Sequence, residues 1–175
     1  LKAFPMIEVA GRYALDIGAS TGGFTDVLLA NNVGHVVAVD VGRGQMAKKI
    51  ATDPRVTLMD ATNARYLAAN MLAMPVELIV CDASFISLKK LLPAVMKLAV
   101  IGAYILALIK PQFEVGKGMV GKGGIVRDAA LHDAVIADIE NWIITEMKWH
   151  HLGTTPSPID GQDGNREFLL AGRKI

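Results

Sequence analysis

The sequence predicts an α/β fold, in which helices cover both faces of a mostly parallel sheet. Two observations carry this prediction. Short runs rich in Val, Ile and Leu recur along the 175 residues, and segments of helical length separate them. The runs are continuously apolar rather than alternating, which is typical of strands buried on both faces, and strands separated by helices form parallel βαβ units. The length is that of one domain.

Five of the apolar runs are expected to form parallel strands. They occupy residues 13–17, 35–40, 56–60, 76–82 and 104–110. Two later runs, at 149–155 and 166–172, are separated by a loop that contains Pro156, Pro158 and several glycines. These two runs are therefore expected to close the sheet as an antiparallel pair.

Helices are expected between the parallel strands, and one more precedes the closing pair. The intervening segments are 21–31, 43–51, 63–73 and 86–97. Ser20 or Thr21 is positioned to cap the first helix, and Asp128 to cap the last, which is expected over 128–147. Apolar side chains recur in the last helix at every fourth position, from Leu131 to Met147. This stripe is predicted to pack in the core rather than to bind a cofactor.

The nearly balanced charge argues against a protein that holds nucleic acid by bulk charge alone. Lys and Arg number 18 and Asp and Glu number 17, which gives a net charge of +1. The charges are nevertheless unevenly distributed. The glycine-rich stretch at 110–127 carries four cations and one anion, whereas residues 128–146 carry five acids and no Lys or Arg.

Several other classes of protein are excluded. The lone cysteine, Cys81, rules out a disulfide framework and fits a reducing compartment. The four histidines have no partners at ligand spacing, so no metal site is predicted. The longest uncharged apolar run, 98–109, has 12 residues, whereas a membrane-spanning helix takes about 18, so no membrane span is predicted. The stretch 116–123 resembles a phosphate-binding loop, but Gly123 replaces the hydroxyl residue that binds magnesium, which disfavours a nucleoside triphosphatase.

A glycine-rich turn follows the first expected strand. Its sequence, DIGASTGGF, places Gly18 and Gly22 where the backbone can approach a ligand and where helix N–H groups can point at it. The second strand ends in Asp40 and the third in Asp60. An acid at the end of the second strand accepts hydrogen bonds from ribose hydroxyls in doubly wound folds. Acids at the ends of three successive strands, Asp16 among them, favour a nucleoside site over a turn that only packs a helix against a strand.

The spacing of the glycines indicates which nucleoside is bound. A dehydrogenase requires G-x-G-x-x-G, whereas the spacing from Gly18 is G-x-x-x-G-G, which favours S-adenosylmethionine over NAD. Asp82 and Lys110 end the fourth and fifth expected strands, and a dehydrogenase function accounts for neither residue. Because neighbouring parallel strands end at the same edge of a sheet, the two side chains are expected to face one crevice.

Six ordered motifs resemble the FtsJ-like methyltransferase domain of the TlyA (hemolysin A) family of rRNA ribose 2′-O-methyltransferases. The motifs are ALDIGASTGGFTDVLL, AVDVG, LIVCDASFISL, LIKPQFEVG, VGKGGIVRD and GNREFLL, and the resemblance covers essentially all of residues 1–175. It implies a Rossmann-like, S-adenosylmethionine-dependent fold with six parallel strands and one antiparallel strand. It further implies a cytoplasmic enzyme whose cofactor is S-adenosyl-L-methionine and whose partner is ribosomal RNA or a ribosomal subunit.

The resemblance also implies a set of site residues. Those implied to bind the cofactor are Gly18, Ala19, Ser20, Thr21, Gly22, Gly23, Phe24, Asp40, Val41, Asp60, Ala61 and Asp82. The family's catalytic group resembles a Lys-Asp-Lys-Glu tetrad, and Asp82, Lys110 and Glu167 match its last three members. The alternatives are a surface cation at Lys110, a structural cap at Asp82 and a solvated edge residue at Glu167.

The first lysine of the tetrad is where this sequence departs from the family. In relatives it lies upstream of the glycine-rich turn in an R-G-G-x-K-L type stretch, whereas Lys2 does not lie in such a motif. The small S4-like RNA-binding domain of the family is also absent, and we expect the sequence to be a fragment. A ribose hydroxyl needs a base to take its proton. Lys110 can serve only when it is neutral, so we hypothesise that the upstream lysine favours this form and that residues 1–175 bind the cofactor but methylate poorly.

RNA is expected to meet the glycine-rich loop and two aromatic side chains. Lys117, Lys122 and Arg127 are predicted to contact RNA phosphates from a mobile flap, with a plain solvated loop as the alternative. Phe85 and Phe113 either stack on a base or pack in the core. Two other functions remain open: a non-enzymatic RNA-binding scaffold that retains the cofactor fold, and the membrane-active protein that the hemolysin name implies.

Overall fold

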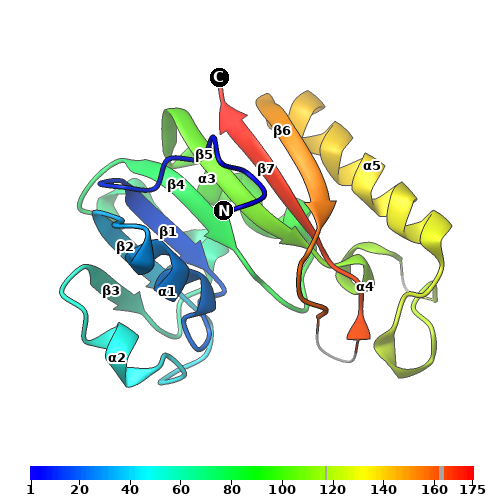
Figure 1. Cartoon of the computed structure of the whole chain (residues 1–175), viewed down its shortest axis with the longest axis horizontal. Coiled ribbons are helices and arrows are strands. Elements are labelled where there is room, and N and C mark those ends of the chain that lie inside the picture. The colour runs from blue at the N-terminus through cyan, green and yellow to red at the C-terminus, as the bar shows by residue number, and fades with distance from the viewer. Residues whose placement is uncertain (117, 162–163) are drawn as a thin grey trace.

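The computed structural model describes residues 1–116, 118–161 and 164–175, and Figure 1 shows a twisted sheet flanked by helices. The sheet has seven strands in the order β3-β2-β1-β4-β5-β7-β6. The strands are β1 (Tyr13–Ile17), β2 (His35–Val39), β3 (Val56–Met59), β4 (Val76–Cys81), β5 (Ala99–Ile109), β6 (Trp149–Pro156) and β7 (Phe168–Lys174). The predicted α/β class is confirmed.

The directions of the strands agree with the sequence prediction. Strands β1 to β5 pair in parallel, and β7 lies antiparallel between β5 and β6. One reversed strand among seven is the arrangement that the resemblance implied. Because β1 lies between β2 and β4, the strand order reverses there, and the carboxyl ends of these strands border a crevice in which doubly wound folds bind ligands.

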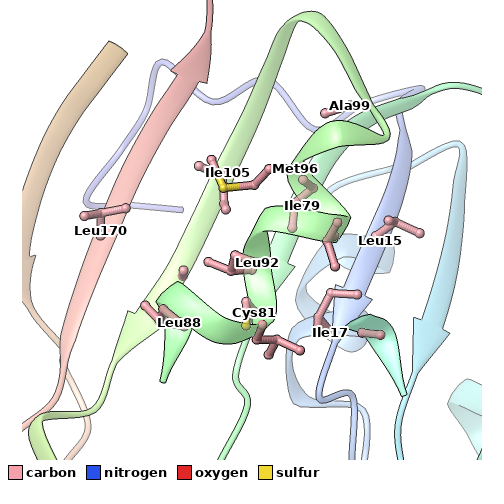
Figure 2. Close-up of a cluster of buried hydrophobic side chains, with 14 of the residues drawn as sticks. Leu15, Ile17, Ile79, Cys81, Leu88, Leu92, Met96, Ala99, Ile105 and Leu170 are labelled. Carbon is pink, nitrogen blue, oxygen red and sulfur yellow. The ribbon is translucent and has the colours of Figure 1, made fainter. Parts of the chain in front are cut away.

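Two apolar layers cover the sheet. On one face, the α3 side chains Leu88, Leu92 and Met96 pack toward the sheet residues Ile79 and Ile105, as Figure 2 shows. This layer also includes apolar residues of α5. On the other face, α1 packs together with the N-terminal residues that precede β1. The helices are α1 (Gly23–Ala30), α2 (Lys48–Ala51), α3 (Leu88–Lys97), α4 (Pro111–Glu114) and α5 (Ala129–Thr145).

Two predicted helices are wrong in large part. Only the last four residues of the expected helix 43–51 are helical, because the carboxylates of Asp40 and Asp60 accept the backbone N–H groups of Gly42 and Gly44 and hold this stretch as a loop. The expected helix 63–73 consists of two 3₁₀ turns, η1 (Ala64–Tyr66) and η2 (Ala69–Met71). At the first of these, Asn63 accepts the N–H of Arg65, and the turn closes after three residues.

The two predicted helix caps have different outcomes. Neither Ser20 nor Thr21 caps α1, whose N-cap is Gly22 in a left-handed conformation with φ of 100°. A glycine adopts this conformation readily, and the turn continues past the hydroxyl residues before the helix begins. Asp128 does cap α5, since its Oδ1 accepts a hydrogen bond from the N–H of Ala130 at 2.9 Å.

Candidate active site

A cleft of about 540 Å³ opens at the carboxyl ends of β1, β2 and β4. Five of the residues predicted to bind a cofactor line it, namely Gly18, Ser20, Asp40, Val41 and Asp82. The remaining walls come from the ends of β1 and β2, from the segments that follow β2, β3 and β4, and from Leu91 of α3. The predicted crevice therefore exists and lies where the strand order reverses.

Gly18 brings the loops after β1 and β4 into backbone contact. Its φ is +78°, and a Cβ at this position would lie 2.7 Å from the carbonyl oxygen of Asp82 and 2.9 Å from the Cα of Ala83. A side chain would thus clash with backbone, and it would also be strained at this φ. The first glycine of the turn is required for the cleft to have this shape.

Asp40 joins the loops after β1 and β2. Its Oδ2 accepts the N–H of Ser20 at 2.8 Å, and its Oδ1 accepts the N–H of Gly42 at 2.7 Å. Each carboxylate oxygen has further acceptor capacity. Beside it, Val41 is 73% exposed at the mouth of the cleft.

Asp60 and Ala61 lie at the loop after β3 but do not line the cleft. The Oδ2 of Asp60 accepts the N–H of Gly44 at 2.8 Å, so this carboxylate holds the loop that follows β2. The cleft is lined instead by the next three residues, Thr62, Asn63 and Ala64, and by Gln45 of the loop. Sequence reasoning missed Gln45 because it assigned this residue to a helix.

The other predicted cofactor residues support the turn without lining the cleft. They are Ala19, Thr21, Gly22, Gly23 and Phe24. The carbonyl oxygen of Thr21 accepts the N–H of Ala47, which ties the turn to the residue before α2. Their part in binding a cofactor remains a prediction.

A second cavity of about 270 Å³ adjoins the cleft, since Ser84 and Phe85 line both. The Nζ of Lys110 lies 2.5 Å from Asp82 Oδ1, 3.1 Å from Ser84 Oγ and 4.0 Å from Glu167 Oε1. The fold therefore brings together the three predicted catalytic residues: Asp82 directly follows β4, Lys110 directly follows β5, and Glu167 directly precedes β7.

Burial excludes the solvated alternatives that were left open for two of these residues, and their catalytic role stays a prediction. The side chain of Lys110 is 12% exposed and that of Glu167 is 7% exposed, so neither is a solvated surface group. Burial raises the pKa of the Glu167 carboxyl, and the charge of Lys110 and a hydrogen bond from Gln112 oppose this effect. Two carboxylates thus face one ammonium group, which they hold and orient.

Two further acids support the site: Glu114, to which sequence reasoning gave no role, and Asp16, which it counted only among the strand-end acids. The carboxylate of Glu114 accepts hydrogen bonds from Ser87 Oγ at 2.6 Å and from the N–H of Leu88 at 2.8 Å, so it ties α4 to the start of α3. Asp16 is fully buried beneath the glycine-rich turn, where Thr25 Oγ1 donates to its Oδ2 at 2.6 Å. Burial raises the pKa of Asp16 to about 6. A charged residue inside the apolar run of β1 was the available signal.

Phe85 does not pack in the core. The residue is 88% exposed, its φ is 66°, and its ring centroid lies 5.1 Å from that of Phe113. A bulky residue is strained at such a φ. The exposed ring lies at the junction of the two cavities, so the core alternative is wrong for this residue.

The structure describes only part of the predicted cationic surface. Lys117 lies outside the described residues, Lys122 is exposed in η3 (Lys122–Gly124), and Arg127 is exposed before α5. Contact with RNA remains a prediction for all three. Lys2 lines a different cavity, together with Asn31, that shares no residue with the Lys110 cavity.

Neither a metal centre nor a membrane segment was predicted. Within residues 1–116, 118–161 and 164–175, no group of three or more His, Cys, Asp or Glu side chains is arranged to hold a metal ion. In the same part of the chain, no helix is both long enough and apolar enough to cross a membrane.

Known proteins match the chain over nearly its whole length. It is 49% identical over 170 residues to the 16S/23S rRNA (cytidine-2'-O)-methyltransferase TlyA of Mycobacterium tuberculosis, which covers 97% of this chain and 63% of that relative. It is 40% identical over 164 residues to Hemolysin A of Brachyspira hyodysenteriae, covering 93% of this chain and 68% of the relative. The chain thus spans less than two thirds of the length of the M. tuberculosis protein.

Solved structures and a family model also match the chain. A Lactococcus lactis protein whose name refers to a hemolysin superposes with a TM-score of 0.94 at 40% identity, over 99% of this chain and 84% of that one. An S-adenosylmethionine-dependent methyltransferase of Mesorhizobium loti shares the fold, with a TM-score of 0.63 at 13% identity over 96% of this chain and 93% of that one. The family model described as FtsJ-like methyltransferase matches residues 1–174. The chain therefore belongs to the FtsJ-like methyltransferase family.

Proposed function

We propose that this chain transfers a methyl group from S-adenosylmethionine to a ribose 2′-hydroxyl of ribosomal RNA. The observation that carries the proposal is the position of Lys110, between Asp82 and Glu167 in a cavity that adjoins the larger cleft. The name of the M. tuberculosis relative supports it. This substrate implies a cytoplasmic enzyme that meets ribosomal RNA or a ribosomal subunit, with residues 1–175 as its catalytic domain.

The larger cleft suits S-adenosylmethionine, which supplies an electrophilic methyl group when it is bound. Its volume of about 540 Å³ is in the range of small-molecule sites. Asp40 keeps free acceptor capacity toward ribose hydroxyls, and Gly18 leaves room for a ligand to approach the backbone. Asn63 and Ala64 form the wall that suits an adenine edge.

Lys110 is the residue that we assign to the target hydroxyl. A ribose hydroxyl is a poor nucleophile, and a positioned base that accepts its proton makes it a better one. In its neutral form, the Nζ of Lys110 orients the hydroxyl and takes its proton. The ammonium group so formed lies between Asp82 and Glu167, whose carboxylates stabilise its charge.

Phe85 is positioned to hold the base of the target nucleotide. Aromatic side chains stack on unpaired RNA bases. The exposed ring of Phe85 lies at the border between the cleft and the Lys110 cavity, so a nucleotide whose ribose reaches Lys110 passes beside it. Phe113, whose ring contacts Phe85, backs this platform.

A methyl-transfer assay tests the proposed function. Tritiated S-adenosylmethionine and ribosomal subunits are incubated with an excess of residues 1–175, so that weak RNA binding does not hide the chemistry. We expect label in the RNA, and a loss of about 10²–10⁴-fold in rate with Lys110→Ala, because proton transfer by a positioned group contributes this much. The matched control is Lys97→Ala, which removes an exposed lysine at the end of α3, before β5 begins.

The outcomes distinguish the enzyme from a scaffold. Calorimetry is used to check that both variants bind S-adenosylmethionine as the wild type does. If the wild type binds the cofactor but labels RNA no faster than Lys110→Ala, the proposed reaction is wrong and a non-enzymatic RNA-binding scaffold is favoured. A rapid rate for residues 1–175 would instead contradict the expectation that an upstream lysine is needed.

A further inference from the structure

We propose that Arg127 and Arg166 form a phosphate-binding site for the RNA backbone beside the Lys110 cavity. The proposal rests on the proposed function, since it takes RNA as the substrate. Both arginines line a cavity of about 310 Å³, together with Ile125, Val126, His132 and Gly164. Sequence reasoning named Arg127 as an RNA contact but gave no role to Arg166.

Val126 and Asn165, which precede the two arginines in sequence, are joined by a hydrogen bond. Val126 donates its N–H to Asn165 Oδ1 at 3.0 Å, and Asn165 Nδ2 donates to the carbonyl oxygen of Gly124 at 3.1 Å. Val126 and Asn165 are each 3% exposed. The backbone next to each arginine is therefore held by buried, hydrogen-bonded neighbours. This lowers the entropy that is lost when an anion binds.

A buried histidine of α5 also holds the backbone at Val126 in place. The Nε2 of His132 lies 2.8 Å from the carbonyl oxygen of Val126, and its ring packs edge-on against Phe168 at the start of β7. His132 itself is 5% exposed. The wall of the cavity is thus held by contacts from α5, from β7 and from the loop between α4 and α5.

The same wall separates the arginines from the Lys110 cavity. Gly124, Asn165 and Glu167 line the Lys110 cavity, whereas the neighbouring residues Ile125 and Arg166 line the arginine cavity. Alternate residues of an extended segment face opposite sides. A single layer of chain therefore lies between the two cavities. Figure 1 shows the segment before α5 and the segment before β7 at the end of the sheet where β5 stops and β7 begins.

The charges at the site favour an anion. Both guanidinium groups belong to exposed residues, and no ion pair joins either of them to a carboxylate among residues 1–116, 118–161 and 164–175. The acid that follows each arginine in sequence is engaged elsewhere: Asp128 caps α5, and Glu167 faces Lys110. A guanidinium group matches phosphate with two parallel hydrogen bonds. Such contacts position a nucleic acid without reading its sequence.

Removal of the two charges tests the site. The variant Arg127→Gln/Arg166→Gln is compared with the wild type by fluorescence anisotropy, with a labelled single-stranded RNA oligonucleotide over a series of KCl concentrations. We expect affinity to fall about tenfold and the log–log salt slope to become shallower by about 0.7 to 1.4, since each phosphate contact on a single strand contributes about 0.7. Arg127→Lys/Arg166→Lys keeps the charge, so it should keep the salt slope while losing part of the affinity.

A matched control removes two charges elsewhere. Lys97→Gln/Arg173→Gln neutralises two exposed residues that do not line the arginine cavity: Lys97 ends α3, and Arg173 pairs with Tyr104 in the middle of β5. This control should bind RNA as the wild type does. In the methyl-transfer assay, the arginine variant should raise the KM for RNA while leaving cofactor affinity and kcat nearly unchanged.

The outcomes separate this proposal from the proposed function. If the glutamine variant binds RNA with unchanged affinity and salt slope while the wild type methylates RNA, the phosphate site is wrong and the function stands. If the control loses as much affinity as the variant, the effect is one of net charge, and the site is again wrong. If the wild type neither binds nor methylates RNA, both proposals fail. Thermal unfolding of each variant shows whether a loss of affinity reflects a loss of fold.

Discussion

The half of the site that we propose to hold the cofactor and the half that we propose to be catalytic are built in different ways. The cleft beside β1 and β2 is shaped by backbone: Gly18 lets two loops touch, and Asp40 accepts two backbone N–H groups. The Lys110 cavity is shaped by side chains from distant segments, since Glu167 lies 57 positions from Lys110 along the chain. The first half depends on backbone conformation and backbone contacts and the second on side-chain packing, so substitutions should affect the two halves differently.

The largest effect is expected for Gly18→Ala in the cofactor half. Its Cβ would meet backbone atoms at 2.7 and 2.9 Å, and its φ is +78°. Overpacking costs about 1–3 kcal/mol and a left-handed residue about 1–2 kcal/mol, so we expect a loss of about 3 kcal/mol in the free energy of unfolding. Urea unfolding measures this loss, and calorimetry should show that cofactor binding is lost with it.

Gly23→Ala is the control for that change. Gly23 begins α1, and a Cβ there meets nothing within 4 Å. Because alanine favours a helix over glycine by up to about 1 kcal/mol, this variant should be as stable as the wild type or slightly more stable. Equal losses for both substitutions would contradict the role assigned to the backbone contact at Gly18.

Asp16→Asn should change how stability depends on pH. Burial raises the pKa of Asp16 from 3.8 to about 6, so between these values the folded protein binds more protons than the unfolded chain. Stability from this group is full below pH 3.8 and is lost as pH rises through about 6. The amide variant should therefore be more stable above pH 6, by up to about 3 kcal/mol for a shift of this size.

Denaturant unfolding across a pH series checks this prediction. The asparagine can still accept the hydrogen bond from Thr25 Oγ1, which now reaches Asp16 Oδ2. Asp26→Asn in the first turn of α1 is the control, and it should not gain stability because Asp26 is exposed. A stability difference between the wild type and Asp16→Asn that is the same at every pH would contradict the assigned pKa.

Asn165→Ala should weaken the catalytic half and spare the cofactor half. The substitution leaves the buried N–H of Val126 without its partner and frees the carbonyl oxygen of Gly124. A buried group left unsatisfied costs about 1–3 kcal/mol, so we expect about 2 kcal/mol less stability and slower methyl transfer. The affinity for S-adenosylmethionine should not change.

The exposed Asn141 of α5 offers the matched control for this variant. Asn141→Ala should leave both stability and methyl transfer unchanged. Calorimetry and the transfer assay together check the prediction. A parallel loss of cofactor affinity in Asn165→Ala would mean that the two halves of the site are not independent.

The smallest effect on stability is expected for Phe85→Gly. Phe85 is 88% exposed and has a φ of 66°, so glycine relieves strain and gives up little burial. We expect a gain of up to about 1 kcal/mol in the free energy of unfolding, together with a raised KM for RNA. Thermal unfolding and the transfer assay measure the two effects. A marked loss of stability would show that Phe85 is structural and not a platform for a base.

Local patterns in the sequence predicted most of the fold. Continuous apolar runs predicted the strands, and the turn DIGASTGGF and the strand-end residues Asp40, Asp82 and Lys110 marked the site. The helices at 43–51 and 63–73 were predicted from segment length, and this signal failed where carboxylates of Asp40 and Asp60 bind backbone N–H groups. The bond between Asp40 and Gly42 is local, but Asp60 and Gly44 lie 16 positions apart, so no local pattern announces the second bond.

The sequence was sufficient for the α/β class, the glycine-rich turn and the expectation that Asp82 and Lys110 face one crevice, because strand burial and turn chemistry act over a few neighbouring residues. The choice of Glu167 came from the family resemblance. Long-range contacts decided the rest. They buried Lys110 and Glu167, left Phe85 exposed, and set Arg166 beside Arg127. These properties depend on which distant segments meet, and hydrogen bonds such as that between Val126 and Asn165 form only after the sheet has brought those segments together.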